Sequence, residues 1–387
     1  MTDGAPAPPA FDAVLVVHPA SEAEVAGLRL LERAAFTLVR AGARRLLCIG
    51  APPRGGLRMP DIATDWVASA DASATAAWLA RAAASVIGMD AAAIVDRETV
   101  VALVADARDT VLAADGHALL WRAPRARVTD VLPQVVALAT AATAADVVRA
   151  PPPFIEATSW TPPADTLLRP VHDAAGSRVA ARALFARLGR PGDGWFTRLV
   201  DRRISRALTR LLLPTGVTPN QVTVASIVVG IVAGVLFATG NRAAAIIGAA
   251  LFLASTIIDG CDGELARITF RESRFGARLD VVGDNVVHVF LFTGIAAGLY
   301  RRDHDPRVAV AGWLLLVGVI VAMGAVYACI VRRRPTTRQR ALFEAFASRE
   351  FAYLLFVLTL AGKLEWFLWV SAAGTYAFVV ALLALRR

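Results

Sequence analysis

The hydrophobic and polar residues follow different patterns in the two halves of the chain. In the first half, short apolar runs alternate with longer segments of helical period. Strands are expected at 11–18 (FDAVLVVH), 44–50 (RRLLCIG) and 91–103, and helices at 22–42 and 71–86. Strands that alternate with helices are typical of an α/β domain, so the pattern predicts an α/β fold with a mostly parallel sheet.

The second half contains long apolar segments that are suited to spanning a membrane. We predict six transmembrane helices, at about 220–239, 243–266, 278–300, 308–331, 348–362 and 365–385. In the second, uninterrupted apolar sequence runs only from Ala243 to Ile258, roughly 24 Å, which is short of the ~30 Å hydrocarbon layer. That helix is therefore expected to continue into the polar residues that follow. The fifth segment is also short.

A connecting region lies between the two patterns. Residues 151–175 contain proline clusters and are expected to form an irregular end of the α/β domain, and 179–188 are expected to form a helix that closes at Gly189. From 190 to 214, apolar residues are interleaved with arginines, which predicts a basic amphipathic helix in the membrane interface. A soluble helix packed on the N-terminal domain is the alternative. The expected division is an α/β domain at 1–175, a linker with the juxtamembrane helix at 176–217, and an α-helical integral membrane domain at 218–387.

The composition supports one soluble part and one membrane part. Hydrophobic residues make up 56% of the 387 residues and the mean hydropathy is +0.55, too apolar for a single soluble domain. The net charge of +9 comes from arginine, because Lys363 is the only lysine, and no basic tail indicates nucleic-acid binding. The three cysteines, Cys48, Cys261 and Cys329, have no paired spacing, which argues against disulfides and zinc.

The charges of the loops predict the orientation of the chain in the membrane. The first residues, MTDGAPAPPA, lack the basic and apolar regions of a signal peptide. The loops at 268–277 and 332–348 are rich in arginine and are expected to face the cytoplasm, although Arg301, Arg302 and Arg307 on the other side weaken the contrast. Both termini are then expected in the cytoplasm, in a multi-pass protein of a bacterial-type inner or plasma membrane.

Four aspartates lie close together in the sequence, beside the second and third apolar segments. Asp259 and Asp262 are three residues apart, and Asp280 and Asp284 are four apart, so each pair projects from one face of its own helix. Four carboxylates in one place would repel one another, whereas one or two hard divalent cations would balance them. The spacing predicts a site for Mg²⁺ or Mn²⁺. Acids in a surface loop between two membrane helices are the alternative.

Three neighbouring residues suit an anionic substrate. Gly263 and Gly276 have no side chain that would keep a phosphate group away from the backbone. Arg267 can pair with phosphate oxygens. A phosphorylated or nucleotide substrate is therefore expected rather than a neutral one.

This stretch resembles the signature of the CDP-alcohol phosphotransferase family. The signature reads here as Asp259-x-x-Asp262-Gly263-x-x-Ala266-Arg267, followed by Gly276-x-x-x-Asp280-x-x-x-Asp284. The resemblance implies that Asp259, Asp262 and Asp280 ligate a pair of metal ions and that Asp284 is the general base, with a metal contact of its own. It places Gly263, Ala266, Arg267 and Gly276 near the nucleotide and its diphosphate. The reaction implied is attack of an alcohol on the β-phosphate of a CDP-alcohol such as CDP-diacylglycerol, with release of CMP, in phospholipid or related phosphodiester biosynthesis. Homodimers are usual in this family.

Four further residues are weaker candidates for the site. The segment Thr218-Pro219-Asn220-Gln221-Val222-Thr223 is typical of a helix start, and it also resembles the entry to the first membrane helix of the family, which would place Asn220 and Thr223 near the nucleotide. His288, one turn beyond Asp284, is a candidate for acceptor binding, although a hydrogen bond between helices explains it more simply. Arg349 is a second acceptor candidate, although contact with lipid headgroups would equally account for it.

The N-terminal α/β domain resembles nucleotidyltransferases only in part. The segment LRLLERAAFTLVRAGARRLLCIG resembles the region that follows the nucleotide loop in sugar-nucleotide and cytidylyl transferases, and VDRETVV resembles their metal-binding strand end, around Asp96. Where those enzymes carry a glycine-rich loop with basic residues, this chain reads HPASEAEVAG. The resemblance therefore implies a degenerate nucleotidyltransferase-like domain.

Two other functions remain open at this point. A bifunctional enzyme would also make its own CDP-alcohol from CTP, and a fused α/β domain resembles an arrangement found with inositol-phosphate chemistry. A non-catalytic membrane scaffold or transporter would keep the helices without needing the full aspartate signature. The donor and the acceptor alcohol are not identified by the sequence.

Overall fold

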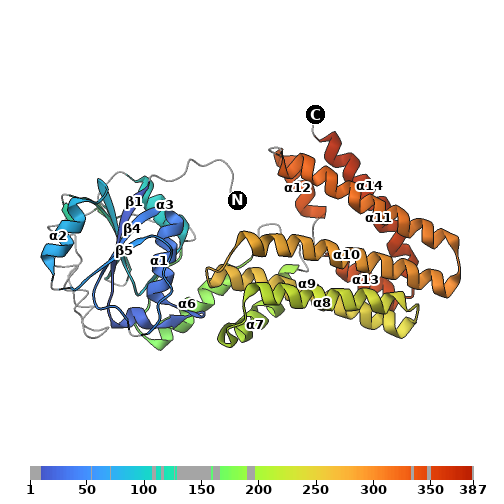
Figure 1. The fold of residues 1–387 in the computed structure, drawn as a ribbon, viewed down its shortest axis with the longest axis horizontal. Helices are drawn as coiled ribbons and strands as arrows, with labels where there is room; N and C mark the ends of the chain where they lie inside the picture. Colours follow the sequence, from blue (N-terminus) through green and yellow to red (C-terminus); the bar gives the residue numbers. More distant parts are fainter. Residues whose placement is uncertain are drawn as a thin grey trace. The chain divides into compact units, whose positions relative to one another are not determined.

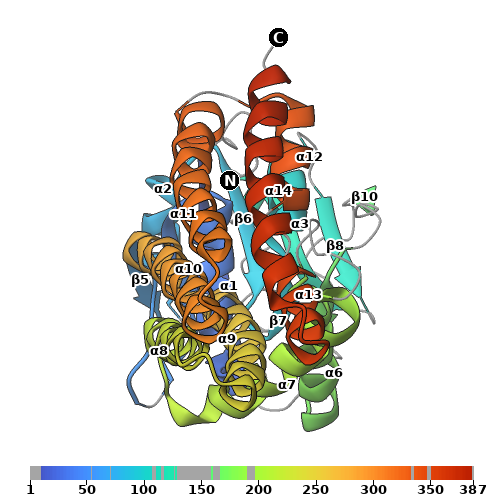
Figure 2. The same ribbon diagram turned by 90° about the vertical axis from the view of Figure 1, so that its right-hand side faces the viewer.

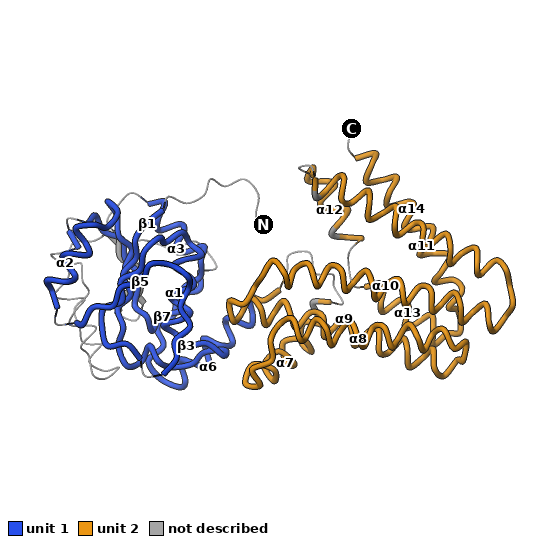
Figure 3. Tube along the Cα trace, in the orientation of Figure 1, with its two compact units in different colours: residues 1–187 blue, residues 188–387 orange. Residues whose placement is uncertain are grey.

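The computed structural model describes residues 10–53, 55–69, 71–106, 110–114, 117–125, 127–128, 158–159, 166–189, 197–332, 335–346 and 350–385. The chain divides into two units, which are residues 1–187 (unit 1) and 188–387 (unit 2), coloured blue and orange in Figure 3. The described part of unit 1 contains strands and helices, whereas that of unit 2 is helical (Figure 1). An α/β part followed by a helical part is the order that the sequence predicts.

Unit 1 is built on a sheet with the strand order β10-β8-β9-β6-β1-β4-β5. Its parallel strands are β1 (Phe11–Val16), β4 (Ala43–Ile49), β5 (Ala63–Val67) and β6 (Ser85–Asp90). On the other side of β6 lie β9 (His117–Pro124) and β8 (Thr110–Ala114), each antiparallel to its neighbour, and β10 (Thr158–Ser159), parallel to β8. The sheet is therefore parallel through its centre and mixed at one side.

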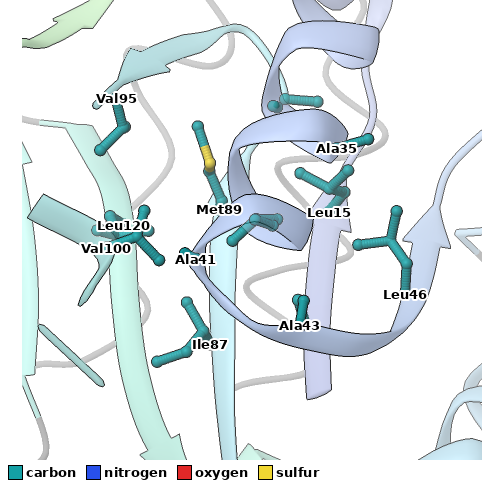
Figure 4. Packing of buried hydrophobic residues seen from close by; sticks show 14 of the residues in the cluster. Leu15, Ala35, Ala41, Ala43, Leu46, Ile87, Met89, Val95, Val100 and Leu120 are labelled. Carbon is teal, nitrogen blue, oxygen red and sulfur yellow. The ribbon is translucent and has the colours of Figure 1, made fainter. Parts of the chain in front are cut away.

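Helices cover both faces of this sheet. They are α1 (Leu30–Ala41), α2 (Ala72–Ala80) and α3 (Arg97–Ala105). Leu15 and Ile87 belong to the apolar layer beneath α1 and α3 (Figure 4), whereas Val14 lies in the other layer, with Trp78 of α2. Every residue of β1 is buried. A strand covered on both faces reads as a nearly continuous apolar run, which is why its sequence pattern was easily recognised.

The helix predicted over 22–42 begins only at Leu30. Before it, the chain forms a short 3-10 turn, η1 (Pro19–Glu22), and a hairpin of β2 (Glu24–Val25) with β3 (Leu28–Arg29). Ala26 and Gly27 at the tip of the hairpin have φ angles of 52° and 73°. A right-handed helix cannot continue through this left-handed conformation, so the predicted helix was too long at its start.

Two other predicted boundaries in unit 1 were wrong. Helix α2 ends at Ala80, and Val86, placed in that helix by the prediction, belongs to β6. The strand predicted over 91–103 is only β7 (Ala93–Val95), after which Asp96 caps α3. Short apolar runs fit helix and strand equally well, so their periodicity alone does not decide between the two. Unit 1 ends with β11 (Leu168–Pro170), antiparallel to β7, and α6 (Ala174–Ala186).

Unit 2 contains five helices, within the residues described, that are long and apolar enough to cross a membrane. They are α8 (Pro219–Ala238), α9 (Arg242–Ile268), α10 (Arg274–Asp303), α11 (Pro306–Val326) with the turn η4 (Tyr327–Val331) after it, and α14 (Leu364–Ala384). As the sequence predicted, α9 continues past its apolar run and through the aspartates. The several apolar helices identify a multi-pass membrane unit.

The segment predicted as the fifth membrane helix is a shorter helix, α13 (Glu350–Leu360). Its 11 residues extend roughly 16 Å, about half of the hydrocarbon thickness. It ends before Gly362, whose φ of 69° turns the chain toward α14. Between α11 and α13 lies α12 (Thr337–Phe346). The number of membrane crossings thus depends on how α13 is counted.

Helix α8 packs against both α9 and α10 (Figure 2). The main chains of α8 and α10 are in direct contact. A Cβ atom added to Gly294 would lie 2.1 Å from the carbonyl oxygen of Gly234, and one added to Gly298 would lie 1.9 Å from that of Phe237. Small residues allow such close approach of membrane helices. The two helices therefore form a closely fitted frame for the residues that they carry.

A juxtamembrane segment precedes α8. It consists of η2 (Thr197–Asp201), α7 (Arg202–Leu212) and η3 (Leu213–Thr215). Its polar residues Arg202, Ser205 and Thr209 are buried, whereas the apolar residues Leu199, Ile204 and Leu211 are 40%, 46% and 70% exposed. The predicted helix is thus present, with Arg202, Ser205 and Thr209 against the protein. Leu208 and Leu212 also pack inward, whereas Arg203 and Arg210 are exposed.

Candidate metal centre

Three of the four predicted aspartates converge where α9 ends and α10 begins. Oxygen atoms of Asp259, Asp280 and Asp284, one from each carboxylate, all lie within 4.8 Å of one another. The side chain of Asp284 is exposed, and the other two are half-buried. Oxygen-only ligands at this spacing are the donors that hard divalent cations such as Mg²⁺ and Mn²⁺ prefer. The three residues therefore fit a metal site that is open on one side.

The turn between α9 and α10 brings these carboxylates together. It contains Phe270, whose φ of 54° reverses the chain. Ser273 then caps α10, and its hydroxyl oxygen accepts a hydrogen bond from the amide of Gly276 at 2.9 Å. Because the two helices run antiparallel from this turn, the end of one faces the start of the other.

Asp262 has a different environment from the three converging aspartates. It is buried, and its carboxylate accepts a hydrogen bond from the hydroxyl of Thr223 on α8. Thr223, predicted as a nucleotide contact, thus contacts a predicted metal ligand in the structure. Hydrogen bonds of this kind orient ligand carboxylates in metal sites.

The remaining predicted diphosphate-binding residues lie around the same helix ends. A Cβ atom on Gly276 would be 2.8 Å from the amide oxygen of Asn220, so only glycine lets that side chain lie so close to α10. Gly263 and Ala266 are half-buried on α9. Arg267, also half-buried, donates from Nη2 to the carbonyl oxygen of Leu188 at 3.4 Å.

Of the two residues predicted to bind the acceptor, the structure describes only His288. Nδ1 of His288 lies 2.6 Å from the main-chain carbonyl oxygen of Asp284, so the ring contacts the backbone of that residue rather than its carboxylate. Its ring is surrounded by Phe252, Phe292 and Phe351, with centroid distances of 6.2, 5.7 and 5.5 Å. Arg349 lies outside the described residues.

Sequence reasoning missed Glu264, which lies inside the aspartate motif. Its side chain is fully buried and accepts hydrogen bonds from Arg202 Nη1 at 2.9 Å, Ser205 Oγ at 2.8 Å and Thr209 Oγ1 at 3.0 Å. All three donors belong to α7, at helical spacing. The helical spacing of Arg202, Ser205 and Thr209 in this arginine-rich helix was the only signal in the sequence, and it did not identify the partner.

The acidic residues at strand ends in unit 1 are occupied by protein donors. Asp96, compared above with a metal-binding position, accepts from the amides of Thr99 and Leu167, both at 2.8 Å, and from the side chains of Thr99 and Arg187. Burial raises the pKa of Asp96, but these hydrogen bonds outweigh it and lower the pKa below its ordinary value. Asp90, at the end of β6, accepts from the amide of Ala92 and contacts Nε2 of His18, both at 2.8 Å.

Comparison with known proteins places this geometry in context. Residues 216–384 match the model of a family described as CDP-alcohol phosphatidyltransferase. The chain is 30% identical over 227 residues to the bifunctional IPC transferase and DIPP synthase of Archaeoglobus fulgidus. The aligned region covers 54% of this chain and 42% of that protein. It is 33% identical over 102 residues to the archaetidylinositol phosphate synthase of Pyrococcus horikoshii, covering 26% of this chain and 50% of that protein. The chain thus spans half or less of the length of these relatives.

A solved structure with some likeness is that of the Mycobacterium tuberculosis phosphatidylinositol phosphate synthase with CDP-DAG bound. The identity is 22% and the TM-score 0.36, and the match covers 47% of this chain and 92% of that one.

Proposed function

We propose that this chain transfers a substituted phosphate group from a CDP-alcohol to an acceptor alcohol and releases CMP, because residues 216–384 match the model of the CDP-alcohol phosphatidyltransferase family. The observation that carries the proposal is the convergence of Asp259, Asp280 and Asp284 at adjoining helix ends. Such a cluster of carboxylates needs a cation to balance it, and a metal-bound diphosphate is the substrate that this family model implies.

Each residue of the site has a role in this proposal. Asp259, Asp280 and Asp284 hold Mg²⁺ or Mn²⁺, with two ions expected, and Asp262 completes the set from its position beside Thr223. A metal bound there would polarise the diphosphate and stabilise negative charge on the departing CMP. Asp284 is the most exposed of the three and takes the proton from the acceptor hydroxyl, whose oxygen attacks the β-phosphate in line.

Other residues position the donor. Arg267 pairs with phosphate oxygens, and Gly263, Ala266 and Gly276 leave room for the diphosphate beside the backbone. Asn220 and Thr223 line the nucleotide side at the start of α8. His288 and Arg349 remain candidates for the acceptor side, and the phenylalanines around His288 make it the more constrained of the two.

The names of the relatives guide the choice of substrates. One relative is named archaetidylinositol phosphate synthase, which indicates a product that contains inositol phosphate. Another is named bifunctional IPC transferase and DIPP synthase. An inositol phosphate is therefore the first acceptor to test, with CDP-diacylglycerol or a smaller CDP-alcohol as donor.

The arrangement in the membrane is part of the same proposal. The chain crosses a bacterial-type plasma membrane six times, with α13 as the short fifth crossing, and functions as a homodimer with both termini in the cytoplasm. Arginine-rich loops beside the aspartate site and before α13 support this orientation. It opens the metal site to the compartment in which nucleotides and Mg²⁺ are found. No nucleic acid is involved.

The α/β domain, assigned to residues 1–175, is proposed to be a degenerate nucleotidyltransferase-like domain. Asp96 supports this role, because its carboxylate is occupied by amide and side-chain donors of the fold. The competing function is a bifunctional enzyme that also makes a CDP-alcohol. One observation favours it: the match to the Archaeoglobus protein is longer than the range 216–384, so it includes residues outside the family model.

One experiment separates these functions. Purified protein in detergent is incubated with Mg²⁺, with either CDP-diacylglycerol or a smaller CDP-alcohol as donor, and with a panel of polyols and inositol phosphates. CMP release is followed with and without chelator. Chelator-sensitive CMP release with one acceptor is the expected result. No release with any donor and acceptor pair, from folded protein, would contradict the proposal.

A parallel assay supplies CTP and inositol phosphate and follows pyrophosphate. Pyrophosphate release would establish the bifunctional enzyme and overturn the assignment of the first domain as degenerate. The scaffold alternative predicts that alanine at Asp280 leaves every property of the protein unchanged.

A further inference from the structure

A buried acidic residue within the aspartate motif takes no part in the transfer described above. Glu264 has no exposed surface, and its carboxylate accepts three hydrogen bonds from α7. One of them comes from the guanidinium of Arg202, which is itself buried, so the contact is also an ion pair. Three of the roughly four lone-pair positions of a carboxylate are thus used by one neighbouring helix.

The position of Glu264 on α9 relates this contact to the metal site. Successive residues of a helix are rotated by about 100°, so Asp259 and Asp262 share one side of α9, and Cys261 and Glu264 lie roughly opposite. The Cys261 thiol is 3.6 Å from the carbonyl oxygen of Ser205, which confirms that this opposite side packs on α7. The same two turns of helix therefore present acids to the site on one side and are anchored to α7 on the other.

The side of α9 that carries the metal ligands has its own anchor. Thr223 of α8 donates to Asp262, and it also lies 3.2 Å from the carbonyl oxygen of Pro219, one turn earlier in α8. The end of α9 is thus held between α8 and α7 by polar contacts at residues 262 and 264. A helix anchored on both sides can neither rotate nor slide without breaking a buried hydrogen bond.

Buried charges specify one arrangement more strictly than apolar contacts do. Transfer of a carboxylate and a guanidinium out of water is costly, and it is offset only while both groups keep their partners. Because all three donors belong to α7, any rotation of α9 against α7 would break the hydrogen bonds of the Glu264 carboxylate to Arg202, Ser205 and Thr209 at the same time. Apolar side chains in the same place would tolerate such a shift.

We propose that Glu264 is a positioning residue of the metal site, which fixes the rotation and height of α9 through α7 and so sets where Asp259 and Asp262 lie. The inference rests on the metal site proposed above. It assigns the juxtamembrane segment a role in metal affinity, in addition to any contact with lipid.

The same segment offers a matched control. Asp201, next to Arg202, accepts a hydrogen bond from the hydroxyl of Tyr353 on α13. Asp201 is buried as well, so Tyr353→Phe removes a comparable buried anchor of the juxtamembrane segment. That anchor leads to α13, which carries none of the proposed metal ligands.

The test compares Mn²⁺ binding by four full-length proteins in detergent, which are the wild type, Glu264→Gln, Tyr353→Phe, and the apolar double variant Arg202→Met with Glu264→Leu. Free Mn²⁺ is measured by electron paramagnetic resonance, and Tm is measured on the same samples. Glutamine keeps an acceptor oxygen but loses the charge, and the double variant removes both charges while keeping side-chain volume. CMP release against Mn²⁺ concentration is recorded in parallel.

We expect Glu264→Gln to raise the half-saturating Mn²⁺ concentration about tenfold, in the range seen when groups behind metal ligands are changed. Tyr353→Phe is expected to lower Tm and leave Mn²⁺ binding unchanged. In the double variant, Tm returns toward that of the wild type while Mn²⁺ binding stays weak. Wild-type Mn²⁺ affinity in a folded double variant would overturn the inference, and so would equal weakening by Tyr353→Phe.

The two readouts separate this inference from the proposed function. If the wild type binds Mn²⁺ but releases no CMP with any substrate pair, the proposed reaction fails, and the Mn²⁺ titrations still decide the role of Glu264. If Glu264→Gln does not fold, the double variant decides instead, since it leaves no unpaired buried charge. A wild type that binds no Mn²⁺ would overturn the inference together with the metal site.

Discussion

The two units treat their acidic residues in opposite ways. In unit 1, Asp90 and Asp96 stand at strand ends, where many α/β proteins bind ligands, and each is surrounded by donors of the protein itself. In unit 2, Asp259, Asp280 and Asp284 stand near helix ends, and one oxygen atom from each lies within 4.8 Å of the others. The first arrangement is complete without a ligand, whereas the second gathers negative charge in one place.

This difference shows that the position of an acid in a fold does not by itself indicate a site. The strand-end acids have the expected position and serve as a helix cap and a histidine partner. The helix-end acids gain their meaning from their mutual distance, because like charges are brought together only where something of opposite charge compensates them. The partners of each carboxylate therefore separate a structural acid from a candidate ligand.

The largest effect is expected from Asp284→Asn. Asparagine keeps the shape but neither accepts the proton nor carries the charge, so the rate of CMP release should fall by ~10²–10⁴-fold or more. The folded, membrane-inserted protein should be unaffected. Asp303→Asn is the matched control, because Asp303 is an exposed acid of the same helix whose carboxylate pairs with Arg302.

Near-normal turnover by Asp284→Asn would show that Asp284 is not the general base. It would also weaken the contrast between the structural acids of unit 1 and the candidate ligands of unit 2. Loss of turnover by Asp303→Asn as well would indicate a general effect of charge on α10 rather than a site.

An intermediate effect is expected from Thr223→Val, which removes the donor to Asp262 and keeps the side-chain volume. We expect the metal concentration for half-maximal CMP release to rise ~10–100-fold, since Asp262 loses its orienting hydrogen bond. Thr239→Val makes the same change at the other end of α8, where the hydroxyl donates to the carbonyl oxygen of Leu236 at 2.8 Å, and should leave the metal requirement as it was.

If Thr223→Val instead alters the affinity for the nucleotide and not for the metal, the nucleotide contact predicted from the sequence would be the better description. Either result sharpens the account of Asp262, whose environment differs from that of the other three aspartates.

The smallest effect on activity is expected in unit 1. Asp96→Asn weakens the contacts with Leu167 and Arg187, and should lower the local free energy of opening of α3 by ~1–3 kcal/mol. Hydrogen exchange of the α3 amides in the full-length protein measures this, and CMP release should not change. Asp71→Asn, an exposed cap of α2, is the control and should act on α2 alone.

The pH dependence of the same contact has a definite sign. The pKa of Asp96 lies below the ordinary value of 3.8, so its stabilising contribution is complete above that pH. It is lost as the pH falls through the lowered pKa of the folded state. Protection of α3 should therefore decrease on acidification below about pH 3.8 in the wild type, and much less in Asp96→Asn. Equal acid sensitivity of the two proteins would assign the effect to other carboxyl groups.

Long apolar segments predicted the secondary structure of this chain more accurately than short apolar runs did. The apolar helices α8, α9, α10, α11 and α14 were predicted nearly at their observed positions, because long segments of high mean hydropathy have few alternatives to a membrane helix. The hairpin of β2 and β3 was missed, since it depends on the left-handed residues Ala26 and Gly27. Within the described residues, the crossing assigned to 348–362 is the helix from Glu350 to Leu360, and the left-handed Gly362 turns the chain just after its end.

The candidate site shows the same division. Helical period was sufficient to expect Asp280 and Asp284 on one face of their helix, and likewise Asp259 and Asp262. It could not tell that Asp259 joins the first pair while Asp262 is held separately by Thr223. The partners of Glu264 and Asp262 lie 39 to 62 residues away on other helices, and no local pattern relates them. Likewise, Asp96 could not be recognised as a cap while its surroundings were assigned to a strand.

The main-chain contact between α8 and α10 has a consequence for how this sequence can vary. Gly294 and Gly298 face carbonyl oxygens of the opposite helix, so even a methyl group there would collide with atoms that have no freedom to turn away. A related sequence that keeps the two helices in this contact is therefore expected to carry glycine at both places. Substitutions that change substrate preference are then expected at other positions.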